Sequence, residues 1–169
     1  IVSYMMTGIL LLSFLLTGCG SQEPQTGKKM SMYYINTAET KVEVHEQYLN
    51  TKTLDEQLDE TMKYLSTTPE KLEYKAPLDM GFRVLDYEVE DGKLLINVDK
   101  AYSELSPTTE VLVRAAIVRT LTQLPNVKYV GITVEDSQLY DNAGEMVGWM
   151  NADQFINNDG NEINTYELV

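Results

Sequence analysis

The feature that most limits the fold is a segment, residues 111–124, that is apolar on almost every side. Only Arg114 and Arg119 interrupt it with charge. The preceding Ser106-Pro107 supplies a helix N-cap and a proline suited to the first helical position, and Pro125 ends the segment. A helix without a polar face has to bury most of its surface, so we expect this one to pack against a sheet.

Strands are predicted on both sides of this helix. Apolar residues alternate in three runs before it: Met80, Phe82 and Val84; Leu85, Tyr87 and Val89; and Leu94, Ile96 and Val98. The first two runs are out of phase, which predicts a β-bulge near Val84 and Leu85. The turn signal Asp91-Gly92 joins the last two runs into a hairpin. After the helix, Val130, Ile132 and Val134 predict one face of a further strand, with Tyr129, Gly131 and Thr133 on the other.

Upstream of these elements the sequence predicts two strands and a second helix. Residues 32–35 and 42–48 are rich in β-forming residues; in the second run, Glu43, His45 and Gln47 point away from Val42 and Val44. Thr53 and Glu56 match a capping box. A helix then follows, with Leu54, Leu58, Met62 and Leu65 at helical spacing.

The predicted order is therefore β-β-α-β-β-α-β. It indicates an α+β domain in which two helices pack on a mixed or antiparallel sheet. Beyond residue 140 the pattern loosens, and residues 141–144 and 157–161 predict turns. Trp149 and Phe155 are expected to fasten this tail to the domain, and a core role for Trp149 is favoured over stacking on a ligand.

The N-terminal residues are typical of a targeting segment. Residues 1–22 carry no charge, residues 9–16 form an apolar core, and Leu16-Thr17-Gly18-Cys19 matches a lipobox. We predict that residues 1–18 are a lipoprotein signal peptide and that Cys19 becomes the acylated N-terminus. Residues 19–30 then form a flexible tether, residues 31–140 the working domain and residues 141–169 a tail.

Two alternatives to a lipoprotein signal are a retained transmembrane helix and a plain secretory signal. About 20 uncharged residues can span a bilayer, but polar and small residues such as Gly8 and Thr17 interrupt this stretch. A plain secretory signal would leave Cys19 without a role, although it is the only cysteine and falls where a lipobox requires it. The first residue is Ile and no Lys or Arg precedes the apolar core, as expected if the sequence lacks its true start. Acylation predicts the extracytoplasmic face of the cell membrane.

Composition excludes several function classes. The 26 acidic residues against 13 Lys and Arg give a formal net charge of −13, which disfavours nucleic-acid binding. A lone cysteine excludes a disulfide framework and a cysteine zinc cluster. His45 is the only histidine, so a metalloprotease helix with two histidines is excluded. We assign no catalytic residue and no cofactor.

Acidic residues offer two weak alternatives. A glycosidase needs one carboxyl group in an apolar pocket beside a second, whereas these acids cluster on a helix face and in turns. Residues 157–161 superficially resemble a calcium loop, and Glu135, Asp136 and Asp141 form a looser cluster. Turn chemistry explains both, so no metal site is assigned.

One passage carries a family resemblance. Residues 116–130, Ala-Ile-Val-Arg-Thr-Leu-Thr-Gln-Leu-Pro-Asn-Val-Lys-Tyr-Val, resemble the hallmark helix–Thr-Leu-Thr–Pro–Val passage of the GerMN sporulation and spore germination domain. The upstream strand, helix, Asp91-Gly92 hairpin and lipobox follow in the family's order, and residues 155–167 resemble the linker to a second copy of the domain. Two loops differ: Thr68-Pro69 replaces the family's usual Gly-Pro, and residues 135–137 replace Asp-Gly.

The resemblance implies a non-enzymatic envelope lipoprotein that acts in sporulation or germination as a scaffold or assembly module. The family's fold is similar to ring-building modules of the channel between mother cell and forespore, so a homo-oligomer or ring stays open. Because the −13 charge opposes self-association, a basic protein partner or charge screening is expected. The alternatives are a regulatory lipoprotein that binds a sensor kinase or small ligand, and a cell-wall enzyme.

Overall fold

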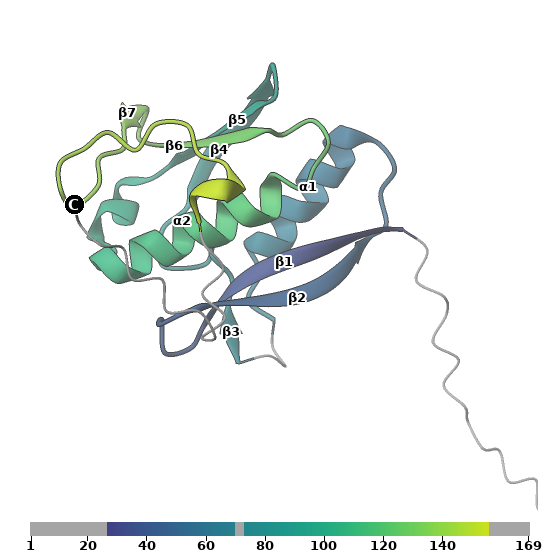
Figure 1. The fold of residues 1–169 in the computed structure, drawn as a ribbon, viewed down its shortest axis with the longest axis horizontal. Helices are drawn as coiled ribbons and strands as arrows, with labels where there is room; N and C mark the ends of the chain where they lie inside the picture. Colours follow the sequence, from purple (N-terminus) through teal and green to yellow (C-terminus); the bar gives the residue numbers. More distant parts are fainter. Residues whose placement is uncertain (1–26, 70–72, 156–169) are drawn as a thin grey trace, which may run out of the picture.

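The computed structural model describes residues 27–69 and 73–155 (Figure 1). The predicted signal peptide, Cys19 and the turn at residues 157–161 lie outside these residues. None of the described helices combines the length and hydropathy needed to cross a bilayer.

A first, antiparallel sheet contains β1 (Lys28–Asn36), β2 (Val42–Leu49) and β3 (Tyr74–Lys75) in the order β2-β1-β3. Strand β1 begins at Lys28, inside the segment predicted to be a tether up to residue 30. Two contacts explain the earlier start: Met30 is buried, and Lys28 Nζ donates to the Gln123 carbonyl oxygen at 2.9 Å. The strand therefore begins at Lys28, where the side chains of the chain first contact the rest of the domain.

The alternation predicted for β2 is confirmed, but Val44 on its valine face is turned to solvent. Val44 lies opposite Tyr33 and is 56% exposed, whereas His45 lies opposite Met32, which is fully buried. The polar residues of β2 thus share a face with buried residues of β1, while Val42, opposite the buried Ile35, contacts the core from the other face. β1 supplies the buried residues, and β2, as the edge strand, extends beyond the core so that even His45 is exposed.

Helix α1 (Leu54–Leu65) begins at the predicted capping box. The Thr53 hydroxyl accepts from the Glu56 amide at 3.3 Å, and the Glu56 carboxylate accepts from the Thr53 amide at 3.2 Å. Leu58, Met62 and Leu65 are buried as predicted, but Leu54 is 43% exposed. Leu54 is the first residue of the helix, where the chain has not yet reached the core.

A second sheet contains β4 (Val84–Glu90), β5 (Lys93–Val98), β6 (Tyr129–Val134) and β7 (Ser137–Gln138) in that order. Strands β4 and β5 form the predicted antiparallel hairpin, with the predicted bulge between Val84 and Asp86. Asp91 and Gly92 have φ values of 49° and 80°, as a two-residue type I′ turn requires. β5 and β6 pair in parallel, and the chain between them contains α2.

The strand predicted to start at Met80 starts instead at Val84. Gly81 has a φ of 92°, which turns the chain before the strand begins. Phe82 is nevertheless buried, because its ring packs edge-on against Tyr102 at a centroid distance of 4.9 Å. Tyr102 lies in the 3₁₀-helix η1 (Lys100–Glu104). Phe82 therefore fits the alternating apolar pattern of a strand because it is buried against Tyr102, although it lies outside the strand.

Helix α2 (Pro107–Leu121) lies between the β1–β2 ribbon and the β5–β6 strands (Figure 1). Ser106 caps it and Pro107 is its first residue, as predicted. Residues from all around its circumference are buried, including Val113, Ala116, Ile117 and Val118. The α+β class is confirmed, with the strands divided between two sheets rather than joined in one. This division is why α2 needs no broad polar face.

The end of α2 closes the free edge of β1. Gln123 Nε2 donates to the Ser31 carbonyl oxygen at 2.7 Å, and Gln123 Oε1 accepts from the Ser31 amide at 3.0 Å. The Thr120 hydroxyl accepts from the Tyr33 amide at 3.0 Å. These side chains take the place of a neighbouring strand, so backbone groups that β2 does not pair are satisfied.

The tail folds back along the edge of β6. The Val130 and Met150 backbones exchange two hydrogen bonds of 2.8 Å, and Phe155 packs against the core after the 3₁₀-helix η2 (Ala152–Gln154). The turn predicted at residues 141–144 is present, with the Asp141 carboxylate accepting from the Ala143 and Glu145 amides at 2.9 Å. The β6 edge is thus covered by β7 and by the tail.

Candidate interaction surface

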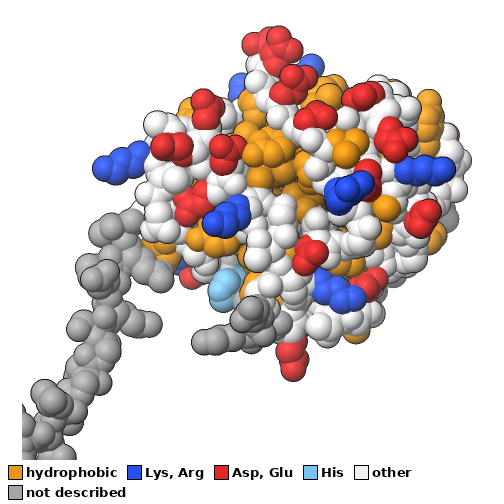
Figure 2. Space-filling model, turned by 180° about the vertical axis from the view of Figure 1, so that it is seen from behind, with side chains coloured by type: hydrophobic (Ala, Val, Ile, Leu, Met, Phe, Trp, Pro, Cys, Tyr) orange, Lys and Arg blue, Asp and Glu red, His pale blue; other side chains and the backbone are white. Residues whose placement is uncertain are grey.

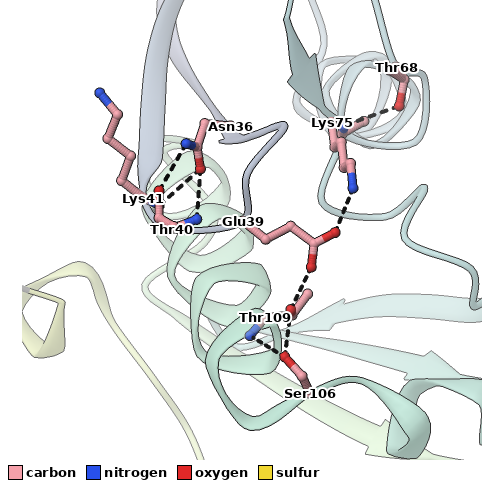
Figure 3. A network of polar contacts seen from close by, with 9 residues as sticks. Asn36, Glu39, Thr40, Lys41, Thr68, Lys75, Ser106 and Thr109 are labelled. Carbon is pink, nitrogen blue, oxygen red and sulfur yellow. Dashed lines mark hydrogen bonds and ion pairs between the residues drawn. The ribbon is translucent and has the colours of Figure 1, made fainter.

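A polar network joins the β1–β2 turn to β3 and to the start of α2 (Figure 3). The Glu39 carboxylate accepts from the Thr109 hydroxyl at 2.6 Å and pairs with Lys75 Nζ. These two hydrogen bonds lower the pKa of Glu39. Asn36 Oδ1 accepts from the Thr40 and Lys41 amides and closes the turn. The network satisfies its own groups and joins segments distant in sequence, so we interpret it as structural.

A second charged group lies in the interior. Glu110 accepts from the Tyr102 hydroxyl at 2.9 Å and from Arg114 Nη2 at 2.9 Å, and its side chain is only 11% exposed. Burial raises the pKa of Tyr102 well above its ordinary value, and the Glu110 charge adds to this effect. The triad of Tyr102, Glu110 and Arg114 pairs its charges internally, so it too is structural.

The exposed candidate is the outer face of the second sheet. Leu94, Ile96 and Val98 are buried, so the intervening residues of β5 project from the opposite face. The register places Lys93 beside Tyr129 and Leu95 beside Gly131. We call the surface formed by Lys93, Leu95, Tyr129 and Trp149 the outer sheet face.

Trp149 lies over Gly131 on this face. A Cβ atom at residue 131 would lie 2.8 Å from Trp149 Cζ3 and 3.2 Å from Leu95 Cδ1, so only glycine leaves room for the indole. Lys93 Nζ lies 5.4 Å from the centroid of the Trp149 ring, within the range of a cation–π contact. Trp149 fastens the tail as predicted, but it is 42% exposed and is not a core residue. Because the sheet interior is already filled by β5 and β6, the indole packs outside it.

We expect Gly131→Ala to lower the free energy of unfolding by about 1–3 kcal/mol and to shift the emission of Trp149 to longer wavelength. The added methyl group overlaps the indole, which then moves into solvent. Trp149 is the single tryptophan, so its fluorescence reports this site alone. In a double-mutant cycle with Trp149→Ala, the cost of Gly131→Ala should largely vanish. An unchanged cost would contradict the proposed overlap.

Acidic residues line this face along β4. Asp86, Glu88 and Glu90 are exposed, and they lie opposite Asn97, Leu95 and Lys93 of β5. We call these three residues the acidic row. Asp86 accepts from Asn97 Nδ2 at 3.1 Å. Within the described part of the chain, neither Glu88 nor Glu90 forms an ion pair.

On its other face, β4 is joined to α1. The Tyr87 hydroxyl donates to Asp59 Oδ1 at 2.7 Å. Burial and this hydrogen bond raise the pKa of Tyr87 to about 12. Leu85, at the bulge, is 49% exposed. Below the acidic projection at the top of Figure 2, hydrophobic side chains reach the surface. The β4 edge therefore has an acidic side and a partly open apolar side.

Of the loose acidic cluster predicted from sequence, Asp136 adjoins this face, because the Asn97 side chain donates to both Asp136 and Asp86. The described part of the chain does not include every residue that the sequence singles out. Cys19 and residues 157–161 lie outside it. Glu135 and Asp136 form the tight β6–β7 turn with φ values of 48° and 63°, and Asp136 Oδ1 accepts from Asn97 Nδ2 at 2.8 Å. In residues 27–69 and 73–155, no group of three or more His, Cys, Asp or Glu side chains is arranged to hold a metal ion.

The outer sheet face itself was missed from sequence. Tyr129, Gly131 and Thr133 were placed together on one face of a strand, but nothing was predicted to cover Gly131. A glycine inside a strand is a known signal of a close approach by another group, and this signal was available. It could not identify Trp149 as that group, because Trp149 arrives from a tail without regular periodicity.

Comparison with known proteins is consistent with this architecture. The Germane family model, described as sporulation and spore germination, matches residues 31–140. No curated protein matches the sequence significantly.

Solved structures show the same fold at low sequence identity. The first GerMN domain of the sporulation protein GerM from Bacillus subtilis matches with a TM-score of 0.53 and 15% identity, over 70% of this chain and 91% of that chain. The tandem GerMN domains of the sporulation protein GerM from Bacillus subtilis match with a TM-score of 0.51 and 19% identity. This match covers 75% of this chain and 46% of that chain. A candidate lipoprotein from Clostridium perfringens matches with a TM-score of 0.50 and 17% identity. This match covers 75% of this chain and 89% of that chain.

Proposed function

Because this chain belongs to the Germane family of sporulation and spore germination domains, we propose that it is a non-enzymatic, membrane-anchored assembly module of the sporulating cell envelope. In this role the folded domain binds other envelope proteins, and the lipid on Cys19 holds it at the extracytoplasmic membrane surface. Anchoring concentrates partners in two dimensions and so strengthens weak contacts.

The observation that carries this proposal is the outer sheet face. Trp149 and Tyr129 are 42% and 40% exposed, yet Trp149 is held in place by Gly131, Leu95 and Lys93. Aromatic side chains that are fixed and exposed bind partners with little loss of conformational entropy. The free edge of β4 adjoins the same surface.

The chemistry of the buried and partly buried acids supports binding rather than catalysis. Glu39 is paired with Lys75 and Thr109, and Glu110 is paired with Arg114 and Tyr102. Each of these carboxylates joins elements of the fold. A catalytic acid would instead face a substrate with a proton or an oxygen lone pair that no hydrogen bond within the fold already uses.

Site-specific photo-crosslinking in cells of the source organism tests the proposal. We expect the full-length protein with p-benzoyl-phenylalanine at position 129 to capture an envelope protein in sporulating cells and not in growing cells. The same probe at the exposed position 104 is the matched control and should capture less. Cys19→Ser should leave the membrane fraction and lose the crosslink.

Three results would contradict the proposal in different ways. Capture of a sensor kinase in growing cells would support the regulatory lipoprotein instead. Equal capture at positions 129 and 104 would show that the outer sheet face is not the interface. A Cys19→Ser variant that stays in the membrane fraction would overturn the lipid anchor.

A further inference from the structure

The two edges of the second sheet differ: the edge beyond β6 is covered and the edge of β4 is free. The β6 edge is covered by β7 and by the backbone of Met150. In the described residues, β4 pairs only with β5, so its opposite edge presents unpaired N–H and C=O groups. A free edge of this kind accepts an added strand from another polypeptide.

Side chains on β4 determine which strand can be added. Glu88 and Glu90 are exposed, lie two positions apart and so project from the same face. Neither is neutralised by an ion pair within the described chain, and Lys93, opposite Glu90, lies against Trp149 instead. A strand next to β4 would place its own alternate side chains 4.5–5.5 Å away, by the usual cross-strand spacing.

This arrangement disfavours a second copy of the chain as the occupant. Two β4 strands paired edge to edge would bring their acidic rows together, and like charges opposite each other are destabilising. The net charge of −13 adds long-range repulsion between copies. A segment with Lys or Arg at alternate positions meets neither obstacle.

The remaining surfaces of β4 favour the same occupant. On the acidic side, Trp149 lies over β6 and β5, where Lys93 already faces its ring, so it leaves Glu88 and Glu90 of β4 exposed. On the opposite side, Leu85 is exposed and Val89 is half-buried. The intervening side chains of the added strand can therefore be apolar and still be sheltered from water.

We propose that the free edge of β4 binds an extended, cationic segment of a partner protein by strand addition, with Lys or Arg of that segment facing the acidic row. This inference deepens the proposed assembly role and rests on it. It names the chemical class of the partner segment and the strand that receives it.

Binding of synthetic peptides to the full-length protein in detergent micelles tests the proposal. The probe is the peptide Lys-Val-Lys-Thr-Lys-Val-Lys-Thr, with fluorescence anisotropy as the readout. One control peptide has the same composition with its four lysines in a block. A second control carries N-methyl groups on alternate amides, which prevents backbone pairing along one edge.

The decisive protein variant is Glu88→Lys/Glu90→Lys. We expect its Kd for the alternating peptide to rise at least tenfold, because two attractive charges become repulsive. Glu104→Lys/Glu145→Lys changes the net charge equally at exposed positions away from β4, and its Kd should rise less than threefold. The block and N-methylated peptides should bind at least tenfold more weakly than the alternating one. Amides of β4 should gain protection from hydrogen exchange when the peptide binds.

Several outcomes would overturn the inference. Equal weakening in the two charge-reversal variants would indicate general electrostatic attraction. Unchanged binding of the N-methylated peptide would exclude strand addition, and so would the absence of binding by the alternating peptide. If photo-crosslinking at position 129 still captured a sporulation-specific partner, the assembly role would stand while this account of β4 fell.

Discussion

Glu110→Ala is expected to lower the free energy of unfolding by about 3–5 kcal/mol. The substitution leaves the Arg114 guanidinium buried without its carboxylate and the Tyr102 hydroxyl without its acceptor. Arg114 is 13% exposed at its side chain and Tyr102 is 1% exposed, so water cannot readily replace the lost partner. Urea unfolding followed by far-ultraviolet circular dichroism measures the change.

Two comparisons separate the loss of a buried charge pair from a general loss of contacts. In the triple variant Tyr102→Phe/Glu110→Leu/Arg114→Met, the whole polar group becomes apolar, and stability should return to within about 2 kcal/mol of the original protein. Glu46→Ala removes the exposed pair with Lys29 and should change stability far less than Glu110→Ala, because water screens the two charges. A Glu110→Ala effect as small as that of Glu46→Ala would show that the triad is solvated.

Gln123→Ala is expected to destabilise the domain by about 2–3 kcal/mol, because it leaves the amide and carbonyl groups of Ser31 unpaired. The loss should be local: the free edge of β1 would separate from the end of α2. Hydrogen exchange of the Ser31 amide should accelerate more than that of amides in β5, which pair with strands on both sides.

Thr122→Ala is the matched control for this prediction. Among the described residues, the Thr122 hydroxyl donates to the Val118 carbonyl oxygen of α2 at 2.7 Å and to no group of β1. Its removal should cost less than about 1 kcal/mol and should leave exchange at Ser31 unchanged. If both variants had the same effect on Ser31, the result would contradict a bridge between Gln123 and β1.

Local features of the fold could be predicted with accuracy. The capping box at Thr53, the Ser106-Pro107 helix start, the Asp91-Gly92 turn and the bulge after Val84 are all present. Each depends on hydrogen bonds or backbone angles among residues a few positions apart. The sequence therefore contains nearly all the information that such features need.

Burial was predicted less accurately where it depends on segments distant in the sequence. The Val42–Val44 face of β2 is a regular apolar alternation, yet Val44 is exposed because β1 supplies the buried side chains at this point. The alternating pattern predicts Phe82 in a strand, but Phe82 is buried against Tyr102, which lies in η1. Periodicity shows that residues share a face and does not show which face meets the core.

The Thr120–Gln123 segment illustrates the difference most clearly. In the sequence it belongs to the passage that resembles the sporulation family; in the structure Thr120 and Gln123 bond to the free edge of β1, far away in the chain. The outer sheet face has a similar origin, since Gly131 was visible in its strand and Trp149 reached it only through the folding of the tail.

The sequence by itself determined the order of the two α-helices and the five longer strands, the helix caps, the Asp91-Gly92 turn, the acidic charge and the family resemblance. Only the tertiary structure decided that the strands form two sheets around α2, that β6 is covered while β4 is free, and that Trp149 lies outside the core. The physical reason is range: caps and turns are fixed by neighbouring residues, whereas burial and edge pairing depend on which distant segments fill the same space.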